Sequence, residues 1–175
     1  MDEPVEITDY DPHSEGRYRA ERDRVRLGLA TASLKFEHIG STAVPGLAGK
    51  PIVDLMLGAS PAVWAALEEL RPRVVALGYE DLGDAGVPGG IYFRKRTALR
   101  AFNLALVEEG GQLWRDNLAL RSYLRAHPEE AAKYAEAKRA AVAGGATTLS
   151  AYATARAKIL ERLVREARGS GQPGS

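Results

Sequence analysis

The feature that most constrains this chain is an apolar run, "PIVDLMLG" (51–58), which carries one aspartate and follows a loop rich in glycine and proline. Its length and its branched side chains predict a strand. Alternation then places Asp54 on the same face as Met56, with Val53 on the other face. A carboxylate inside such a strand costs several kcal/mol unless it is paired or bound. Asp54 is therefore predicted either to pair within the fold or to hold something that binds there.

The loop before this strand, "GSTAVPGLAGK" (40–50), has the chemistry of an anion site. Gly40 lets the backbone approach a ligand without a Cβ in the way. Ser41 and Thr42 offer hydroxyl groups, and neighbouring backbone N–H groups can cradle a phosphate. Lys50 is the nearest cation downstream. The loop and Asp54 together predict a cleft for an anionic small molecule. The structural alternative is an internal salt bridge from Asp54 to Lys50, Arg94 or Arg100.

Composition excludes several classes of protein. The 175 residues carry a formal net charge of +1, which disfavours a nucleic-acid partner captured by bulk charge. Because the chain has no cysteine, disulfides, thiolate metal sites and a cysteine nucleophile are excluded. No apolar run approaches the ~20 residues of a membrane span, and the acidic N-terminus lacks a signal-peptide core. A cytoplasmic location without membrane attachment is expected.

The order of the predicted elements indicates an α+β or mixed α/β domain, with a small mixed sheet packed by helices and a C-terminal helical part. A single domain is predicted over 1–168, and a disordered tail over 169–175. Pro72 is expected to break or restart the helix that begins at 61, and 77–90 is predicted to be rich in turns. Strands are predicted over 35–39, 51–58, 91–96 and 99–108, and helices over 15–33, from 61, and over 112–126, 129–143 and 148–167.

The segment "FEHIGSTAVPGLAGKPIVDLML" resembles the core signature of the GrpB family, an uncharacterised family. "YDPHSEGRYRAERDRVR" is similar to the opening of the family, and "WRDNLALRSYLRAHPEEAAKYAEAKR" to its C-terminal helical part, so the resemblance covers roughly residues 9 to 167. The family looks like a small relative of the nucleotidyltransferase superfamily. The resemblance implies that Gly40 and Ser41 hold a triphosphate, that Asp54 is the first metal-binding carboxylate, that Mg²⁺ is the cofactor, and that ATP or another nucleotide is the substrate.

Two positions depart from the expected pattern. The second carboxylate of the superfamily falls on Met56, whose thioether does not suit Mg²⁺, a cation that prefers oxygen. Histidines that the family usually carries on a later strand fall on Asn103 and Ala105. Asn103 can still hydrogen-bond a ligand, whereas Ala105 only makes room. The departures fit either a changed substrate or a decayed site.

Further candidates lie outside the loop. His38 can act as a catalytic group, or it can be a core histidine satisfied by hydrogen bonds. Arg94 and Arg100 flank the expected cleft from the strands, and Arg121 and Lys138 reach it from the C-terminal helices. Each can bind a phosphate or a carboxylate of the substrate. The alternative for each is a solvated or salt-bridged surface.

Three functions remain open from the sequence. The first is a nucleotidyltransferase-like enzyme acting on a nucleotide or on another phosphorylated or carboxylated small molecule. The second is a non-catalytic domain that uses the same cleft to hold a ligand. The third is a repurposed small-molecule enzyme, catalysing a cyclisation or an amide-forming step without two-metal chemistry.

Overall fold

The computed structural model describes residues 3–30 and 33–171, and within them one mixed sheet forms the centre of the fold. The order of its strands is β1-β2-β5-β4-β3. The β2–β5 pair is parallel and the other pairs are antiparallel. This arrangement confirms the mixed α/β class. The strands are β1 Leu34–Ile39, β2 Val53–Ala59, β3 Glu80–Asp81, β4 Gly90–Arg96 and β5 Ala101–Glu108.

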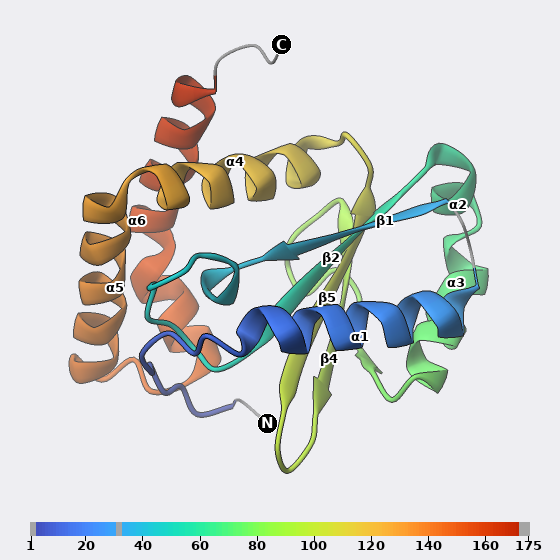
Figure 1. The fold of residues 1–175 in the computed structure, drawn as a ribbon, viewed down its shortest axis with the longest axis horizontal. Helices are drawn as coiled ribbons and strands as arrows, with labels where there is room; N and C mark the ends of the chain where they lie inside the picture. Colours follow the sequence, from blue (N-terminus) through green and yellow to red (C-terminus); the bar gives the residue numbers. More distant parts are fainter. Residues whose placement is uncertain (1–2, 31–32, 172–175) are drawn as a thin grey trace.

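Helices cover the sheet from both sides and from one end (Figure 1). Figure 1 shows α1 lying across the sheet, α2 and α3 near one end, and α4, α5 and α6 grouped at the opposite side. A short 3-10 turn, Ser41–Ala43, follows β1. The helices are α1 Ser14–Leu29, α2 Pro61–Ala65, α3 Leu67–Ala76, α4 Gln112–Ala126, α5 Pro128–Ala143 and α6 Leu149–Ser170.

Three apolar clusters hold the layers together. One face of the sheet, including Leu55 and Leu104, packs on α1 and α3. The other face, including Met56, packs on Trp114 of α4. In the third cluster, Leu47 of the Gly-Ser loop packs among residues of α4, α5 and α6. The loop is thus fixed between the sheet and the C-terminal helices, which brings polar side chains of α5 and α6 to the Gly-Ser turn.

Three predicted boundaries were wrong. The first helix ends at Leu29 rather than at 33, because Ala30 adopts a left-handed conformation, and 31–32 lie outside the described residues. The second helix breaks at Ala66, while Pro72 lies inside α3. Burial of Leu70 and Val74 of α3 offsets a proline cost of about 3 kcal/mol. The strand β3 lies within the segment expected to be turns, because it completes the edge beside β4.

The ends of the chain also differ from expectation. The helix α6 continues to Ser170, two residues into the predicted tail, and 172–175 lie outside the described residues. The N-terminal lead-in is anchored by backbone bridges from Pro4 to Thr148 and from Thr8 to Gly49. In the described ranges, no helix combines the length and hydrophobicity that a membrane crossing requires.

Candidate functional site

Asp54 lies beside Asn103, because β2 and β5 pair in parallel with these two residues in register. The Asn103 Nδ2 donates to Asp54 Oδ1 at 2.8 Å. The Arg96 Nη2 donates to the Asn103 Oδ1 at 3.1 Å, which fixes the orientation of the amide. Arg96 in turn forms an ion pair with Glu3 at 3.0 Å. Within the described ranges Asp54 forms no direct ion pair, so the alternative of an internal salt bridge to Lys50, Arg94 or Arg100 is not seen, and the carboxylate contacts the Asn103 amide instead.

The Gly-Ser turn passes directly over the Asp54 carboxylate. Gly40 has φ 74°, in the left-handed region that favours glycine. A Cβ at this position would lie 2.4 Å from Asp54 Oδ2. A similar close approach occurs at Gly49, where a Cβ would lie 2.4 Å from the Ser41 Oγ. Both glycines are thus required by the packing of the site.

Lys138 of α5 contacts the Gly-Ser turn. Its side chain is buried, with 1% of the residue exposed. Its Nζ donates to the Ser41 Oγ at 3.2 Å and also to the Ala48 carbonyl oxygen. The ammonium group lies 4.4 Å from the centre of the Tyr134 ring, a cation–π contact. The pKa of Lys138 is lowered to about 7, mainly by burial and in addition by the charges of Arg156 and Lys50, whereas the charge of Asp54 opposes the shift.

Arg156 of α6 belongs to the same site, although sequence reasoning did not select it. Its Nη1 donates to the Tyr134 hydroxyl at 2.9 Å, and its guanidinium lies 5.3 Å from the centre of the Tyr152 ring. Its Nε is buried without a hydrogen-bond partner in the described structure. A buried donor left unpaired indicates a place that a ligand acceptor can fill. The available signal was the helical i, i+4 spacing from Tyr152, which occurs too often to be specific.

We call Lys50, Lys138 and Arg156 the cation cluster. The three residues come from the Gly-Ser loop, α5 and α6, and their charges all act on Asp54. The Lys50 Nζ lies 5.7 Å from the Tyr152 ring. Burial raises the pKa of Asp54, and the charge of Lys50 is the strongest influence that lowers it. Three cations around one carboxylate make this region a receptor for negative charge.

A pair of Mg²⁺ ions does not fit these residues. The second carboxylate position is Met56, which is fully buried against Trp114. Among the described residues, no three histidine, aspartate or glutamate side chains converge on one point. The one carboxylate present already accepts from Asn103 and lies among cations. Hard divalent cations need several oxygen ligands, and this site supplies too few of them.

His38 lies on the opposite face of the sheet from Asp54, because it pairs with Leu55 in the β1–β2 ladder. Its ring stacks on Tyr18 with 4.5 Å between the ring centres. The Nδ1 contacts the Glu15 Oε2 and the Nε2 contacts the Thr42 Oγ1, each at 2.9 Å. The ring is 4% exposed. These contacts match the alternative of a core histidine that is satisfied by hydrogen bonds.

This environment makes His38 a source of acid sensitivity. Burial lowers the pKa of His38 below its usual value, so the unfolded chain binds the proton more readily than the folded chain does. Stability should therefore fall as pH drops below about 6.5. We expect His38→Gln to reduce this loss between pH 7 and pH 5, as measured by urea denaturation at each pH. The matched control is His13→Gln at an exposed position, and equal slopes in wild type and His38→Gln would contradict the assignment.

The remaining candidates lie apart from the cation cluster. The Arg121 Nη1 donates to Glu37 at 2.7 Å and to the His38 carbonyl oxygen at 2.8 Å. Arg94 forms an ion pair with Glu80 at 2.6 Å. Arg100 is exposed beside the β4–β5 turn. The structure therefore brings together one subset of the predicted residues: Gly40, Ser41, Lys50, Asp54, Asn103 and Lys138.

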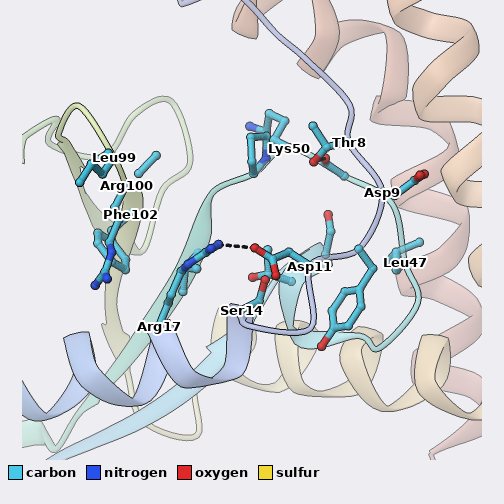
Figure 2. A pocket seen from close by; sticks show the side chains of 17 residues that line it. Thr8, Asp9, Asp11, Ser14, Arg17, Leu47, Lys50, Leu99, Arg100 and Phe102 are labelled. Atoms are coloured by element: carbon cyan, nitrogen blue, oxygen red, sulfur yellow. Dashed lines mark hydrogen bonds and ion pairs between the residues drawn. The ribbon is translucent and has the colours of Figure 1, made fainter.

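A cavity of about 310 Å³ opens beside the Gly-Ser turn and is drawn in Figure 2. Ser41, Thr42 and Lys50 line it, as expected for the loop. Asp54 does not line it. From β2 the cavity is reached by Val53, which points to the opposite face of the sheet from Asp54, and from β5 by Phe102 on that same face and by the first residue of the strand, Ala101. The expectation of one cleft formed by both the loop and Asp54 was therefore wrong for this cavity.

Comparisons with known proteins assign a family to this arrangement. The model of the GrpB protein family matches residues 4–166. The UPF0157 protein YqkA of Bacillus subtilis is 30% identical over 148 residues, which cover 85% of this chain but 43% of YqkA. The UPF0157 protein SCO7215 of Streptomyces coelicolor is 31% identical over 156 residues, covering 89% of this chain and 80% of that protein.

Two solved structures are similar to this chain to different degrees. The crystal structure of the conserved protein GrpB from Enterococcus faecalis matches with a TM-score of 0.81 and 25% identity, covering 93% of this chain and 96% of that one. The Cid1 poly(U) polymerase is similar more distantly, with a TM-score of 0.48 and 16% identity over 67% of this chain and 38% of that one. The chain spans less than half the length of YqkA, and nearly the whole of the Enterococcus protein.

Proposed function

This chain belongs to the GrpB family, and on that premise we propose that it is a nucleotidyltransferase-like protein that holds a negatively charged group of its substrate at the Gly-Ser turn. The substrate is a nucleotide or another phosphorylated or carboxylated small molecule. Lys50, Lys138 and Arg156 neutralise its charge, and the Ser41 hydroxyl and Asn103 amide orient it. The observation that carries this proposal is the convergence of three cations from separate elements beside an unpaired Arg156 Nε.

The physical support is that the cations are already desolvated. Lys138 is fully enclosed, and its nearest contacts are a hydroxyl, a carbonyl oxygen and an aromatic ring rather than a carboxylate. Burying a cation without a counter-ion is unfavourable by itself. An anionic ligand removes that penalty, because its charge pairs with the ammonium in surroundings of low dielectric constant.

We further propose that the ligand binds without a metal pair. The cation cluster supplies the positive charge that two Mg²⁺ ions would otherwise bring, and Asp54 supplies a proton acceptor rather than a set of metal ligands. A carboxylate with a raised pKa accepts a proton more readily than an ordinary one. This observation favours the repurposed small-molecule enzyme as the second candidate function, with Asp54 taking a proton from a substrate that the cation cluster holds.

Calorimetry with ATP, with Mg²⁺ and with EDTA, tests the proposal. We expect binding in both conditions, and Asp54→Asn should bind ATP at least as tightly as wild type because it removes a negative charge near the phosphates. The control is Asp84→Asn in an exposed turn, which should leave the affinity unchanged.

Two outcomes would contradict the proposal. Binding that requires Mg²⁺ and disappears in Asp54→Asn would make Asp54 a metal ligand. If neither ATP nor inorganic phosphate gave binding heat, with Mg²⁺ or with EDTA, the proposal of an anion site at the Gly-Ser turn would be wrong. Binding of phosphate but not of ATP would favour the second candidate function over the nucleotidyltransferase-like one.

A further inference from the structure

We propose that the cavity of about 310 Å³ beside the Gly-Ser turn binds a second ligand, a small carboxylate with an apolar body. This inference extends the proposed function, because the cavity shares Ser41 and Lys50 with the anion site. The two sites nevertheless lie on opposite faces of the sheet. The only residues that the two sites share are Ser41 and Lys50, so a ligand in the cavity and a substrate at the cation cluster can approach each other only at the Gly-Ser turn.

The walls of the cavity come from three separate segments. Figure 2 shows the lead-in residues Thr8 and Asp11 on one side and the β4–β5 hairpin residues Arg100 and Phe102 on the other, with Lys50 near Thr8. The lead-in is held in place by its backbone bridge from Thr8 to Gly49. The cavity is thus built by tertiary contacts and does not belong to a single loop.

Among the described residues that line the cavity, the Arg100 side chain forms no ion pair, hydrogen bond or cation–π contact. Arg17 forms an ion pair with Asp11 at 2.6 Å, so these two charges cancel. Asp9 forms an ion pair with Arg139 at 2.6 Å, and Figure 2 shows its side chain directed away from the other labelled residues. The charge of Lys50 already acts on Asp54. The Arg100 guanidinium has no side-chain partner among the described residues, and a single guanidinium matches a singly charged carboxylate.

The rest of the lining is apolar. Phe102 is 3% exposed and Val53 is 4% exposed, and both form part of the cavity wall on the α1 side. Leu99 at the hairpin turn is 92% exposed, a large apolar side chain left in water at the cavity edge. Covering such surface gains roughly 25 cal/mol for each Å² removed from water. An apolar group on the ligand would use this surface while its carboxylate contacts Arg100.

The size of the cavity limits the ligand. Pockets for small molecules range from about 300 to 1,000 Å³, so this cavity lies at the lower end of that range. It suits a molecule the size of an amino-acid derivative better than a complete nucleotide. The nucleotide or phosphate would then occupy the cation cluster, and the carboxylate would occupy the cavity.

The test is a titration of the full chain with N-acetyl-L-phenylalanine, followed by backbone amide NMR. We expect shifts at the amides of residues 8–11 and 99–102, and smaller shifts with the uncharged carboxamide of the same compound. Arg100→Ala should weaken binding by about tenfold or more, since it removes a charge-assisted hydrogen bond. The control Arg165→Ala, at an exposed position of α6, should bind like wild type.

The two sites can fail separately in this experiment. Phosphate binding at Lys138 should persist in Arg100→Ala, so loss of carboxylate binding alone would support two sites. Equal shifts with the acid and the carboxamide, or shifts confined to the surroundings of Lys138, would overturn the second site and leave the proposed function standing. If the acid caused no shift while phosphate still bound, the second site would likewise be overturned and the proposed function would stand.

Discussion

Lys138→Met is expected to weaken the binding of ATP or inorganic phosphate by at least about a hundredfold at pH 7. The ammonium that would meet the anion is enclosed and contacts the Ser41 Oγ at 3.2 Å, so no solvent-exposed lysine can replace it. Methionine fills a similar volume without charge, so the packing around Tyr134 should survive. Calorimetry measures the affinity, and Lys133→Met on the exposed side of the same helix is the matched control.

The same substitution should change how stability depends on pH. The pKa of Lys138 is about 7 in the folded chain and 10.5 is its ordinary value, so between these pH values the unfolded chain binds more protons than the folded chain does. Stability therefore rises with pH across this window, by up to roughly 1.4 kcal/mol for each pH unit. Lys138→Met removes this contribution, so the variant should be more stable relative to wild type at pH 7 than at pH 9.5. Urea denaturation at both pH values measures the difference.

Two results would contradict this account of Lys138. If wild type and Lys138→Met kept the same difference in unfolding free energy at pH 7 and pH 9.5, the lysine would carry its charge in the folded state over the whole window. If phosphate affinity were unchanged in Lys138→Met and in Lys133→Met alike, the anion would bind elsewhere.

Gly40→Ala is expected to destabilise the fold by about 2 to 4 kcal/mol. Gly40 has φ 74° and ψ −171°, a region essentially limited to glycine, which costs about 1 to 3 kcal/mol for a residue with a Cβ. The added Cβ would also lie 2.4 Å from Asp54 Oδ2, so the carboxylate must shift, which strains the hydrogen bond that its Oδ1 accepts from Asn103. Chemical denaturation measures the loss of stability, and the affinity for phosphate should fall with it because the turn and the carboxylate move together.

Gly46→Ala provides the control for this prediction. Gly46 has φ 83°, and no atom lies within 4 Å of an added Cβ, so this variant carries the backbone strain without the contact. Gly40→Ala should therefore lose more stability than Gly46→Ala, because only the Cβ at position 40 meets Asp54. Equal destabilisation at both positions, with phosphate affinity retained in Gly40→Ala, would show that the approach of the turn to Asp54 has no role in the site.

Much of the sheet could be predicted from the sequence. The alternation in "PIVDLMLG" places Asp54 with Met56 and opposite Val53, and the structure has this arrangement. The same period placed Asn103 and Ala105 on one face of a later strand. What alternation could not supply was the register between strands, which makes Asn103 the direct neighbour of Asp54. Register depends on pairing between segments far apart in the chain, and no local pattern encodes it.

The residues of the candidate site were even harder to predict from local sequence patterns than the strand register. Lys138 was a candidate only as one of several basic residues on helices, and Arg156 was not a candidate at all. Both residues matter because α5 and α6 pack on the Gly-Ser loop through Leu47 and its neighbours. That packing removes the two cations from water, and removal from water is what separates them from the exposed basic residues.

The sequence alone determined the mixed α/β class, the Gly-Ser turn and the position of a single carboxylate in a buried strand, because these depend on local periods and on the conformational freedom of glycine. The tertiary structure decided which polar residues meet. It placed His38 on the far face, left Arg94 and Arg121 in ion pairs, and assembled Lys50, Lys138 and Arg156 around Asp54. Desolvation and charge–charge interaction depend on distances in space, so only the packed chain could set them.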